Sequence, residues 1–328
     1  MSTLTDAAVR RILFIFVAIG CGEALAPTVR LNNGLEMPAI GLGTYLNTAQ
    51  DGECERAVRD AIDAGYRHID TAFLYGTEKE VGNGIRSKIA EGVIRREDVF
   101  VVTKLWSTFH KPDQVAKAFQ RSFDNLNLTY IDLYLMHFPL AYKQLHKDGS
   151  SRVPQSIDDV NLFPTVNGQP IYDDIDFVDT WRAMEDLLRS GYVRSIGVSN
   201  FDIPQMERLL SETSVRPVTN QVECHPNLDQ LPLIKYCRDR DISVTAYSPL
   251  GRPYEGANNL AIKDPKVQAI AAAHNKTPAQ VVLRYSYQNG AIVIPKSTNQ
   301  QRIKENFNIF DFNLSPEEMS VLHGFNQQ

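Results

Sequence analysis

The sequence has few cysteines, no excess of basic charge and no hydrophobic run of the ~20 residues that a membrane-spanning helix needs. Its four cysteines form no C-x-x-C pair, so neither a zinc ribbon nor a disulfide-stapled scaffold is predicted. The 34 basic side chains are outnumbered by 39 acidic ones, which argues against a surface built for phosphate backbones or anionic membranes. We therefore expect no nucleic-acid partner and a fold that is held by packing.

The amino terminus differs in composition from the rest of the chain. Arg10 and Arg11 precede a short apolar run over residues 12–20, and Ala24-Leu25-Ala26 is typical of a signal-peptide cleavage site. We interpret residues 1–26 as a leader that is removed, and residues 27–328 as a single domain that needs no membrane once mature. A mistaken start codon and a membrane-tethered end are the alternatives.

From residue 28 onward, short β-branched runs alternate with amphipathic helical stretches. Asn32-Asn33-Gly34 separates two short strands over 29–31 and 35–37, as in a hairpin whose turn needs positive φ. Helical patterns over 53–64, 78–90 and 177–189 each end near a glycine. Parallel strands buried on both faces are predicted near residues 39–43, 67–71, 99–105, 131–137, 195–199, 219–223, 243–247 and 291–295. Eight βα units predict an α/β (β/α)8 TIM barrel that opens with a hairpin, not a doubly wound sheet.

Polar side chains follow three successive strands of this barrel at their carboxyl ends, where TIM barrels hold their active sites. Asp70 and Tyr75 follow the second strand, Lys104 the third and His137 the fourth. A lysine held by Asp70 is expected to lower the pKa of Tyr75 from its reference value of about 10, which would make the phenol a proton donor. His137 would then orient a substrate carbonyl.

Taken singly, each of these residues has a structural interpretation. Asp70 could end a strand, Lys104 could be solvated, Tyr75 could be a loop aromatic and His137 a packed core histidine. Their occurrence at three successive strand ends favours a catalytic site. Two other functions remain open: a metal-dependent hydrolase, with His68, Asp70, His137 and His225 as ligands, and a nucleotide-binding barrel without turnover.

The spacing Tyr75-x-x-x-Lys79 also matches short-chain dehydrogenases, which have a different fold. That pattern is weak, because no glycine-rich dinucleotide fingerprint precedes it. Gly41-Leu42-Gly43 lacks the third glycine of such a fingerprint.

The motifs HIDTAFLYG, VTKLW and YLMHFP resemble those of the aldo-keto reductase family, and the resemblance runs from about residue 28 to the C-terminus. It implies that Asp70, Tyr75, Lys104 and His137 form a catalytic tetrad. In that family an aldehyde or ketone receives a hydride from NADPH, and here Tyr75 would supply the proton. The resemblance implies a small-molecule carbonyl substrate and no metal, and we expect a monomer.

Further motifs imply contacts with NADPH/NADP+. GVSNF and NQVECHP match ligands of the nicotinamide carboxamide, AYSPLG matches a ring-stacking tyrosine and the pyrophosphate loop, and IPKSTNQQRIKEN matches a 2′-phosphate clamp and adenine contacts. Two cations and a hydroxyl near a helix N-terminus suit a dianionic phosphate, so NADPH should be preferred over NADH. The implied cofactor residues are Thr44, Asp70, Ser199, Asn200, Gln221, Tyr247, Ser248, Leu250, Lys296, Ser297, Arg302, Glu305 and Asn306.

The substrate pocket departs from the family pattern. Tyr45 and Phe138 stand where tryptophans are usual, and with Tyr75, Trp106 and His137 they are the expected substrate contacts. The chain stops soon after residues 322–325, which predicts a pocket open on one side and suited to bulky apolar carbonyls such as ketosteroids or aromatic dicarbonyls. The combination of this pocket, the short carboxyl terminus and the leader resembles some insect 3-dehydroecdysteroid reductases, which implies an ecdysteroid ketone as a candidate substrate. The leader indicates secretion whereas the family is mostly cytosolic, so the location is left open.

Overall fold

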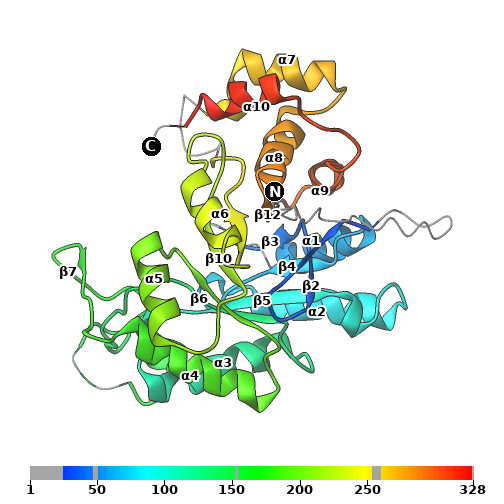
Figure 1. The fold of residues 1–328 in the computed structure, drawn as a ribbon. Coiled ribbons are helices and arrows are strands. Elements are labelled where there is room, and N and C mark those ends of the chain that lie inside the picture. The colour runs from blue at the N-terminus through cyan, green and yellow to red at the C-terminus, as the bar shows by residue number, and fades with distance from the viewer. Residues whose placement is uncertain (1–24, 47–50, 151, 153, 253–259, 327–328) are drawn as a thin grey trace, which may run out of the picture.

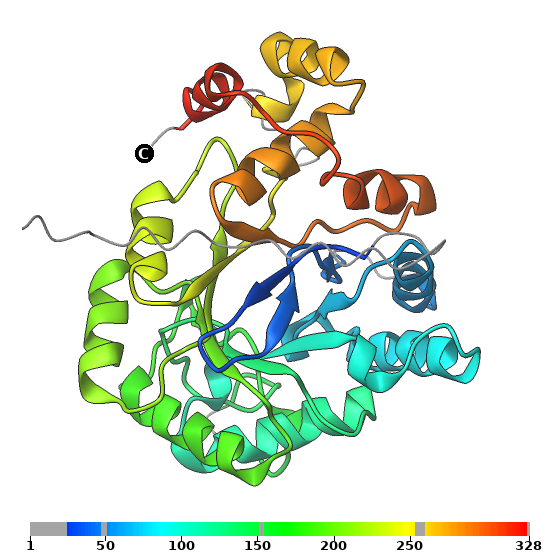
Figure 2. The same cartoon turned by 45° about the vertical axis from the view of Figure 1, so that its right-hand side comes forward.

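The computed structural model describes residues 25–326 except 47–50, 151, 153 and 253–259. A ring of parallel strands lies at the centre and helices surround it (Figures 1 and 2). Only Leu25 and Ala26 of the predicted leader fall among these residues, so the leader stays a prediction. None of the helices within the described ranges is long and apolar enough to cross a bilayer.

Eight parallel strands confirm the predicted barrel. Their order is β3–β4–β5–β6–β9–β10–β11–β12, which follows the chain. The first and last strands meet where Gly41 N donates to Val293 O at 2.9 Å and Gly43 N donates to Pro295 O at 3.1 Å, which closes the ring. The strands are β3 (Leu42–Gly43), β4 (His68–Asp70), β5 (Phe100–Leu105), β6 (Leu133–Met136), β9 (Ile196–Ser199), β10 (Thr219–Glu223), β11 (Ser243–Tyr247) and β12 (Ala291–Val293).

The helices form because apolar side chains recur on one face and cover the sheet. The three helices predicted from their glycine ends are α1, α2 and α4, and Gly65, Gly92 and Gly191 take positive φ just after them. The helices are α1 (Glu53–Asp63), α2 (Glu78–Ala90), α3 (Pro112–Leu126), α4 (Phe177–Ser190), α5 (Ile203–Glu212), α6 (Leu231–Arg238), α7 (Pro265–Ala273), α8 (Pro278–Gln288), α9 (Gln300–Phe307) and α10 (Pro316–His323).

The predicted hairpin covers the amino-terminal end of the barrel, as Figure 2 shows. Strands β1 (Thr28–Arg30) and β2 (Glu36–Pro38) pair antiparallel, and Gly34 makes the turn at a φ of 87°. Met37 packs with Phe100 and Leu133 in one buried cluster. The hairpin therefore closes the amino-terminal end of the barrel. The carboxyl ends of the strands lie at the opposite end, which is the mouth.

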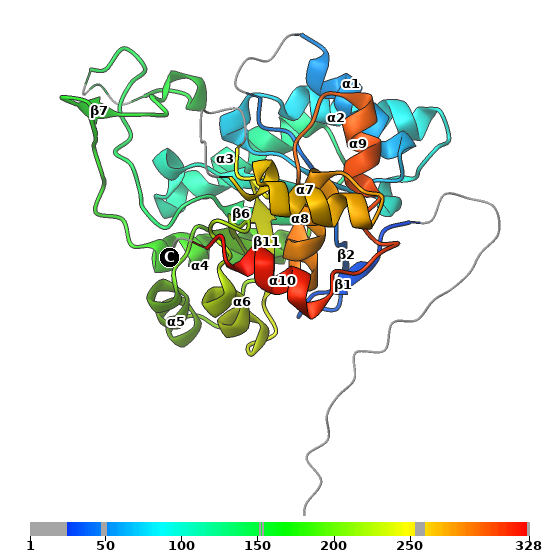
Figure 3. The same cartoon turned by 90° about the horizontal axis from the view of Figure 1, so that it is seen from above.

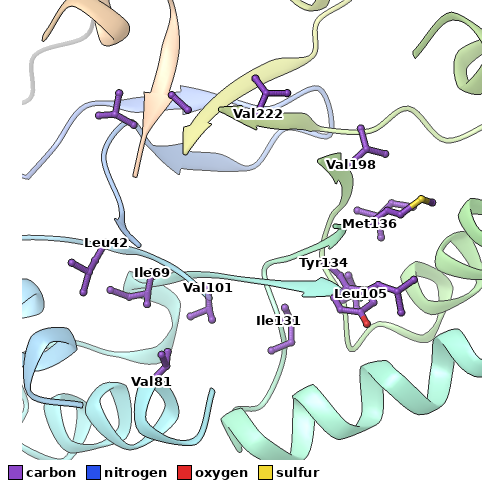
Figure 4. Packing of buried hydrophobic residues seen from close by; sticks show 14 of the residues in the cluster. Leu42, Ile69, Val81, Val101, Leu105, Ile131, Tyr134, Met136, Val198 and Val222 are labelled. Atoms are coloured by element: carbon purple, nitrogen blue, oxygen red, sulfur yellow. The ribbon is translucent and has the colours of Figure 1, made fainter. Parts of the chain in front are cut away.

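Side chains of each strand alternate between the barrel interior and the helix layer. Val102 of β5 belongs to the cluster that includes the hairpin, whereas Val101 and Leu105 belong to the cluster shared with the helices. Figure 4 shows Val101 beside Ile69 of β4, near Val81 of α2. This alternation places Lys104 on the interior face of β5.

The connection after β6 is long and holds a second hairpin that the sequence analysis did not identify. Strands β7 (Thr165–Val166) and β8 (Gln169–Pro170) pair antiparallel and lie away from the barrel (Figure 3). The other long connection, after β11, holds α7 and α8. Both connections begin at the carboxyl ends of their strands, at the mouth of the barrel.

Candidate active site

The carboxyl ends of β4, β5 and β6 bring the four predicted catalytic residues together. Lys104 Nζ lies 2.5 Å from Asp70 Oδ1 and donates to Tyr75 Oη at 3.3 Å. Tyr75 closes a 3-10 turn, η1 (Phe73–Tyr75), which follows β4. The rings of Tyr75 and His137 lie 5.8 Å apart between centroids. The predicted Asp70–Lys104 pair is therefore present, with the phenol beside it.

Burial controls the protonation of this cluster. The side chain of Lys104 is fully buried and that of Asp70 almost so. Burial lowers the pKa of Lys104, while the charge of Asp70 opposes this shift. Burial raises the pKa of Tyr75 well above its ordinary value, and Asp70 and Tyr45 add to the rise.

The expectation that Lys104 would lower the pKa of Tyr75 is therefore wrong for this structure. Desolvation of a phenolate is the largest cause of the rise, and the charge of Lys104 is compensated by Asp70 beside it. Tyr75 rests as a neutral phenol. The hydrogen bond from Lys104 is placed to stabilise a phenolate when Tyr75 gives up its proton.

His137 lies at the end of β6 and is 7% exposed. Burial lowers its pKa well below the ordinary value, and the charge of Lys104 lowers it further. Its Nδ1 has no hydrogen-bond partner among the described residues. A neutral imidazole at this place can orient a carbonyl by hydrogen bonding but carries no charge of its own.

Hydrogen bonds link the expected carboxamide ligands to the catalytic residues, which the sequence analysis did not foresee. Gln221 Nε2 donates to Asp70 Oδ2 at 2.7 Å, so both oxygens of that carboxylate are engaged. Asn200 Nδ2 donates to the backbone oxygen of His137 at 2.8 Å. Tyr247 Oη donates to Asn200 Oδ1 at 2.9 Å. Strand positions alone predict that these residues are near one another, but not which atoms bond.

The other expected cofactor residues lie along the same end of the barrel. Thr44 Oγ1 donates to the backbone oxygen of Asp70 at 3.0 Å. Ser199 ends β9 and donates to the backbone oxygen of Gln221 at 2.7 Å. Ser248 and Leu250 follow β11, and Lys296 and Ser297 follow β12, while Arg302, Glu305 and Asn306 lie on α9.

The 2′-phosphate residues fit a dianion. Lys296 and Arg302 are both exposed, and no carboxylate within the described ranges lies at ion-pairing distance from either of them. Asn299 caps α9 by accepting from Arg302 N at 2.9 Å. Two uncompensated cations beside a helix N-terminus are the donor set that a phosphate dianion requires.

Aromatic side chains border the mouth. Tyr45, Phe138 and Phe163 are exposed, and Phe163, from the long loop after β6, was not predicted. Trp106 is only 3% exposed, because the long loop after β6 covers it. Its Nε1 donates to Leu162 O of that loop at 2.7 Å. Trp106 thus anchors the loop, while the other three rings form the accessible border.

The alternative as a metal-dependent hydrolase finds no support in the geometry. No group of three or more His, Cys, Asp or Glu side chains within the described part of the chain is arranged to hold a metal ion. His68 Nδ1 lies 3.3 Å from Pro38 O, and His225 lies beside Glu223. Asp70 is committed to Lys104. The closed barrel is also unlike the open sheet of short-chain dehydrogenases.

Comparison with known proteins gives a consistent result. The model of the Aldo/keto reductase family matches residues 39–327. The chain is 43% identical over 308 residues to aldo-keto reductase family 1 member A1-A of Danio rerio, covering 92% of this chain and 90% of the relative. It is 45% identical over 307 residues to dihydrodiol dehydrogenase 3 of Bos taurus, covering 91% of each. Estradiol 17 beta-dehydrogenase 5 of Mus musculus is 43% identical over 308 residues, covering 92% of this chain and 91% of the relative.

Solved structures are similar over the same extent. A Bombyx mori aldo-keto reductase in complex with NADP superposes with a TM-score of 0.81 at 42% identity, covering 92% of this chain and 94% of the other. The aldose reductase of Schistosoma japonicum gives a TM-score of 0.82 at 40% identity, covering 92% and 93%.

Proposed function

This chain belongs to the aldo/keto reductase family, and on that premise we propose that it reduces bulky apolar ketones and aldehydes to alcohols with NADPH. It is an NADP-dependent oxidoreductase. The observation that carries the proposal is the buried Asp70–Lys104 pair with the Tyr75 hydroxyl 3.3 Å from the ammonium. Such a cluster can give a proton to a developing alkoxide.

NADPH supplies the hydride when it is bound. Tyr75 holds the proton at Oη and gives it to the substrate oxygen as negative charge develops there. Lys104 Nζ stabilises the resulting phenolate, and Asp70 keeps the ammonium charged inside the protein. Neutral His137 donates a hydrogen bond that orients the carbonyl. Asn200 and Gln221 offer the carboxamide partners that fix the nicotinamide, and Tyr247 a ring on which it stacks.

The direct test is the consumption of NADPH by purified protein, followed at fixed cofactor concentration with a panel of carbonyl compounds. Turnover of at least one ketone or aldehyde, without added metal, supports the proposal. Binding of NADPH without turnover of any carbonyl would instead favour a barrel that binds the nucleotide and does no chemistry.

We expect Arg302→Ala to weaken NADPH binding by about 1–3 kcal/mol and to leave NADH binding almost unchanged, because only NADPH carries the 2′-phosphate. Fluorescence titration of both cofactors measures the two affinities. Lys304→Ala, on the same helix, is the matched control for general loss of positive charge. Equal kcat/KM of the wild type for NADPH and NADH would contradict the assignment of Lys296 and Arg302 to the phosphate.

We expect a higher kcat/KM for ketosteroids, including 3-dehydroecdysone, and for aromatic dicarbonyls than for glucose or xylose. The exposed rings of Tyr45, Phe138 and Phe163 offer apolar area, and burial contributes about 25 cal/mol per Å². Similar relatives include a dihydrodiol dehydrogenase and an estradiol 17 beta-dehydrogenase. The comparison is run at fixed NADPH, and aldoses turned over as efficiently as ketosteroids would refute it.

We also propose that the domain works as a monomer without nucleic-acid or membrane partners. The acid cluster, which consists of Asp70, Tyr75, Lys104 and His137, comes from one barrel, so no second subunit is needed to complete it. The net charge of −5 gives no reason to expect a polyanionic partner.

A further inference from the structure

Glu78 is a buried carboxylate outside the acid cluster. It is the first residue of α2 and is 1% exposed. Thr103 Oγ1 donates to its Oε1 at 2.7 Å, and Asn125 Nδ2 donates to its Oε2 at 2.9 Å. One side chain thus joins α2 to strand β5 and to helix α3, within the layer between the barrel and its helices.

Glu78 and Thr103 are both close in sequence to residues of the acid cluster. Thr103 precedes Lys104 on β5, and the two side chains point to opposite faces of the strand. Glu78 follows Tyr75 by three residues, with Gly76 at a φ of 69° and the buried Thr77 between them. The bond between Glu78 and Thr103 therefore ties the turn that carries the phenol to the strand that carries the ammonium.

The hydrogen bond between Glu78 and Thr103 controls the distance between Tyr75 and Lys104, and that distance has little tolerance. Tyr75 Oη and Lys104 Nζ are 3.3 Å apart, near the outer limit for a hydrogen bond between such groups. Outward movement of the turn by a fraction of an ångström would break this bond. Misplacement of a reacting group by about 1 Å can reduce a rate by as much as 10²-fold.

The carboxylate itself needs an explanation, because burying it is unfavourable unless hydrogen bonds compensate. Burial raises the pKa of Glu78, whereas its hydrogen bonds to Asn125 and Thr103 lower it. Glu78 also interacts electrostatically with Lys104. A neutral amide of the same shape keeps a hydrogen-bonding group at this position without the charge, so Glu78→Gln separates positioning from electrostatics.

We propose that Glu78 is a positioning residue for proton transfer: with Thr103 and Asn125 it holds the Tyr75 turn against the strand of Lys104. This inference rests on the proposed reductase function and deepens it. It assigns a positioning role to Glu78, Thr103 and Asn125, none of which is among the expected catalytic, cofactor or substrate residues.

Two matched pairs of variants test the proposal in the full chain. Thr103→Val removes the hydroxyl and Thr103→Ser keeps it, while Glu78→Ala removes both acceptors and Glu78→Gln keeps the shape. We expect Thr103→Val and Glu78→Ala to lower kcat by roughly 10-fold or more, with the Kd for NADPH within about 2-fold of wild type, and the conservative members of each pair to restore most of kcat. Glu185→Ala, at a buried glutamate of α4 that accepts from Val215 N, is the control for general destabilisation.

Crystal structures of Thr103→Val and Glu78→Ala supply a readout independent of activity. The distance between Tyr75 Oη and Lys104 Nζ should exceed 3.3 Å in both. An unchanged distance together with an unchanged kcat overturns the proposal, as does a loss of kcat that Glu185→Ala reproduces. If the wild type reduces no carbonyl, the proposed function fails, while the distance still decides whether Glu78 positions Tyr75. If Glu78→Ala does not fold, the Thr103 pair alone carries the test.

Discussion

A Tyr75→Phe enzyme is expected to reduce carbonyls at least ~10²-fold more slowly than the wild type while its affinity for NADPH is nearly unchanged. The substitution removes one oxygen and keeps the ring. The hydroxyl it removes is the proposed proton donor, which Lys104 contacts at 3.3 Å. Because the proton is transferred in the transition state, its loss lowers kcat rather than substrate or cofactor binding. Steady-state kinetics with one good ketone and a fluorescence titration with NADPH measure the two quantities.

Tyr192→Phe is the matched control. Its ring is about half exposed and packs edge-on against Phe123 at 5.4 Å, just before β9 and at the end of the barrel away from the mouth. This variant also removes one phenolic oxygen and keeps the ring, so it should keep kcat within about 3-fold. Retained activity in Tyr75→Phe would instead assign the acid role to His137.

Burial holds the pKa of Tyr75 well above its ordinary value, so loss of the phenolic proton should not limit reduction by the wild type between neutral and mildly alkaline pH. The pH dependence of kcat measures this, and a fall in kcat over that range would contradict it.

Lys104→Met is expected to lower kcat to a similar degree and, unlike Tyr75→Phe, to cost about 3–5 kcal/mol of unfolding free energy. The substitution leaves the Asp70 carboxylate buried without its counter-charge at 2.5 Å. It also removes the donor that stabilises the Tyr75 phenolate. Urea denaturation measures the stability, and the same ketone assay measures kcat.

A double variant separates the two effects. Asp70→Asn combined with Lys104→Met removes both charges, and the new amide can still accept from Gln221 Nε2, so much of the stability should return while activity does not. The surface pair Lys235–Asp239 has the same 2.5 Å separation but is largely exposed, so Lys235→Met should cost less than about 1 kcal/mol. A loss of stability no larger for Lys104→Met than for Lys235→Met would contradict the importance of burial.

The elements that the sequence predicted are those that packing controls. The strands at 219–223 and 243–247 have the predicted bounds, and both are buried along most of their length, although the sequence of β10 (TNQVE) is largely polar. The hairpin β7–β8 was not predicted, because its strands are two residues each, exposed, and without an apolar face. Its turn carried a readable signal in Asn167-Gly168, both of which take positive φ.

The site was also predicted only in part. Strand-end positions correctly predicted that Asp70, Tyr75, Lys104 and His137 gather, because parallel strands of a barrel end at one mouth. The shift of the Tyr75 pKa was predicted with the wrong sign, because burial of a loop residue cannot be inferred from its neighbours in sequence. The role of Glu78 was also missed, because it reads as an ordinary acidic residue in the first turn of a helix.

Closure of the barrel has a consequence for how the protein is made. The segment around β3 finds its second neighbour only in residues 293–296, through Gly41 to Val293 and Gly43 to Pro295. At 5–20 residues per second, a ribosome needs roughly 12–50 s to synthesise the intervening ~250 residues. Throughout that time one edge of the growing sheet is open to pairing with other nascent chains. The barrel can therefore close only after the last strand has been synthesised, so its completion follows translation of nearly the whole chain.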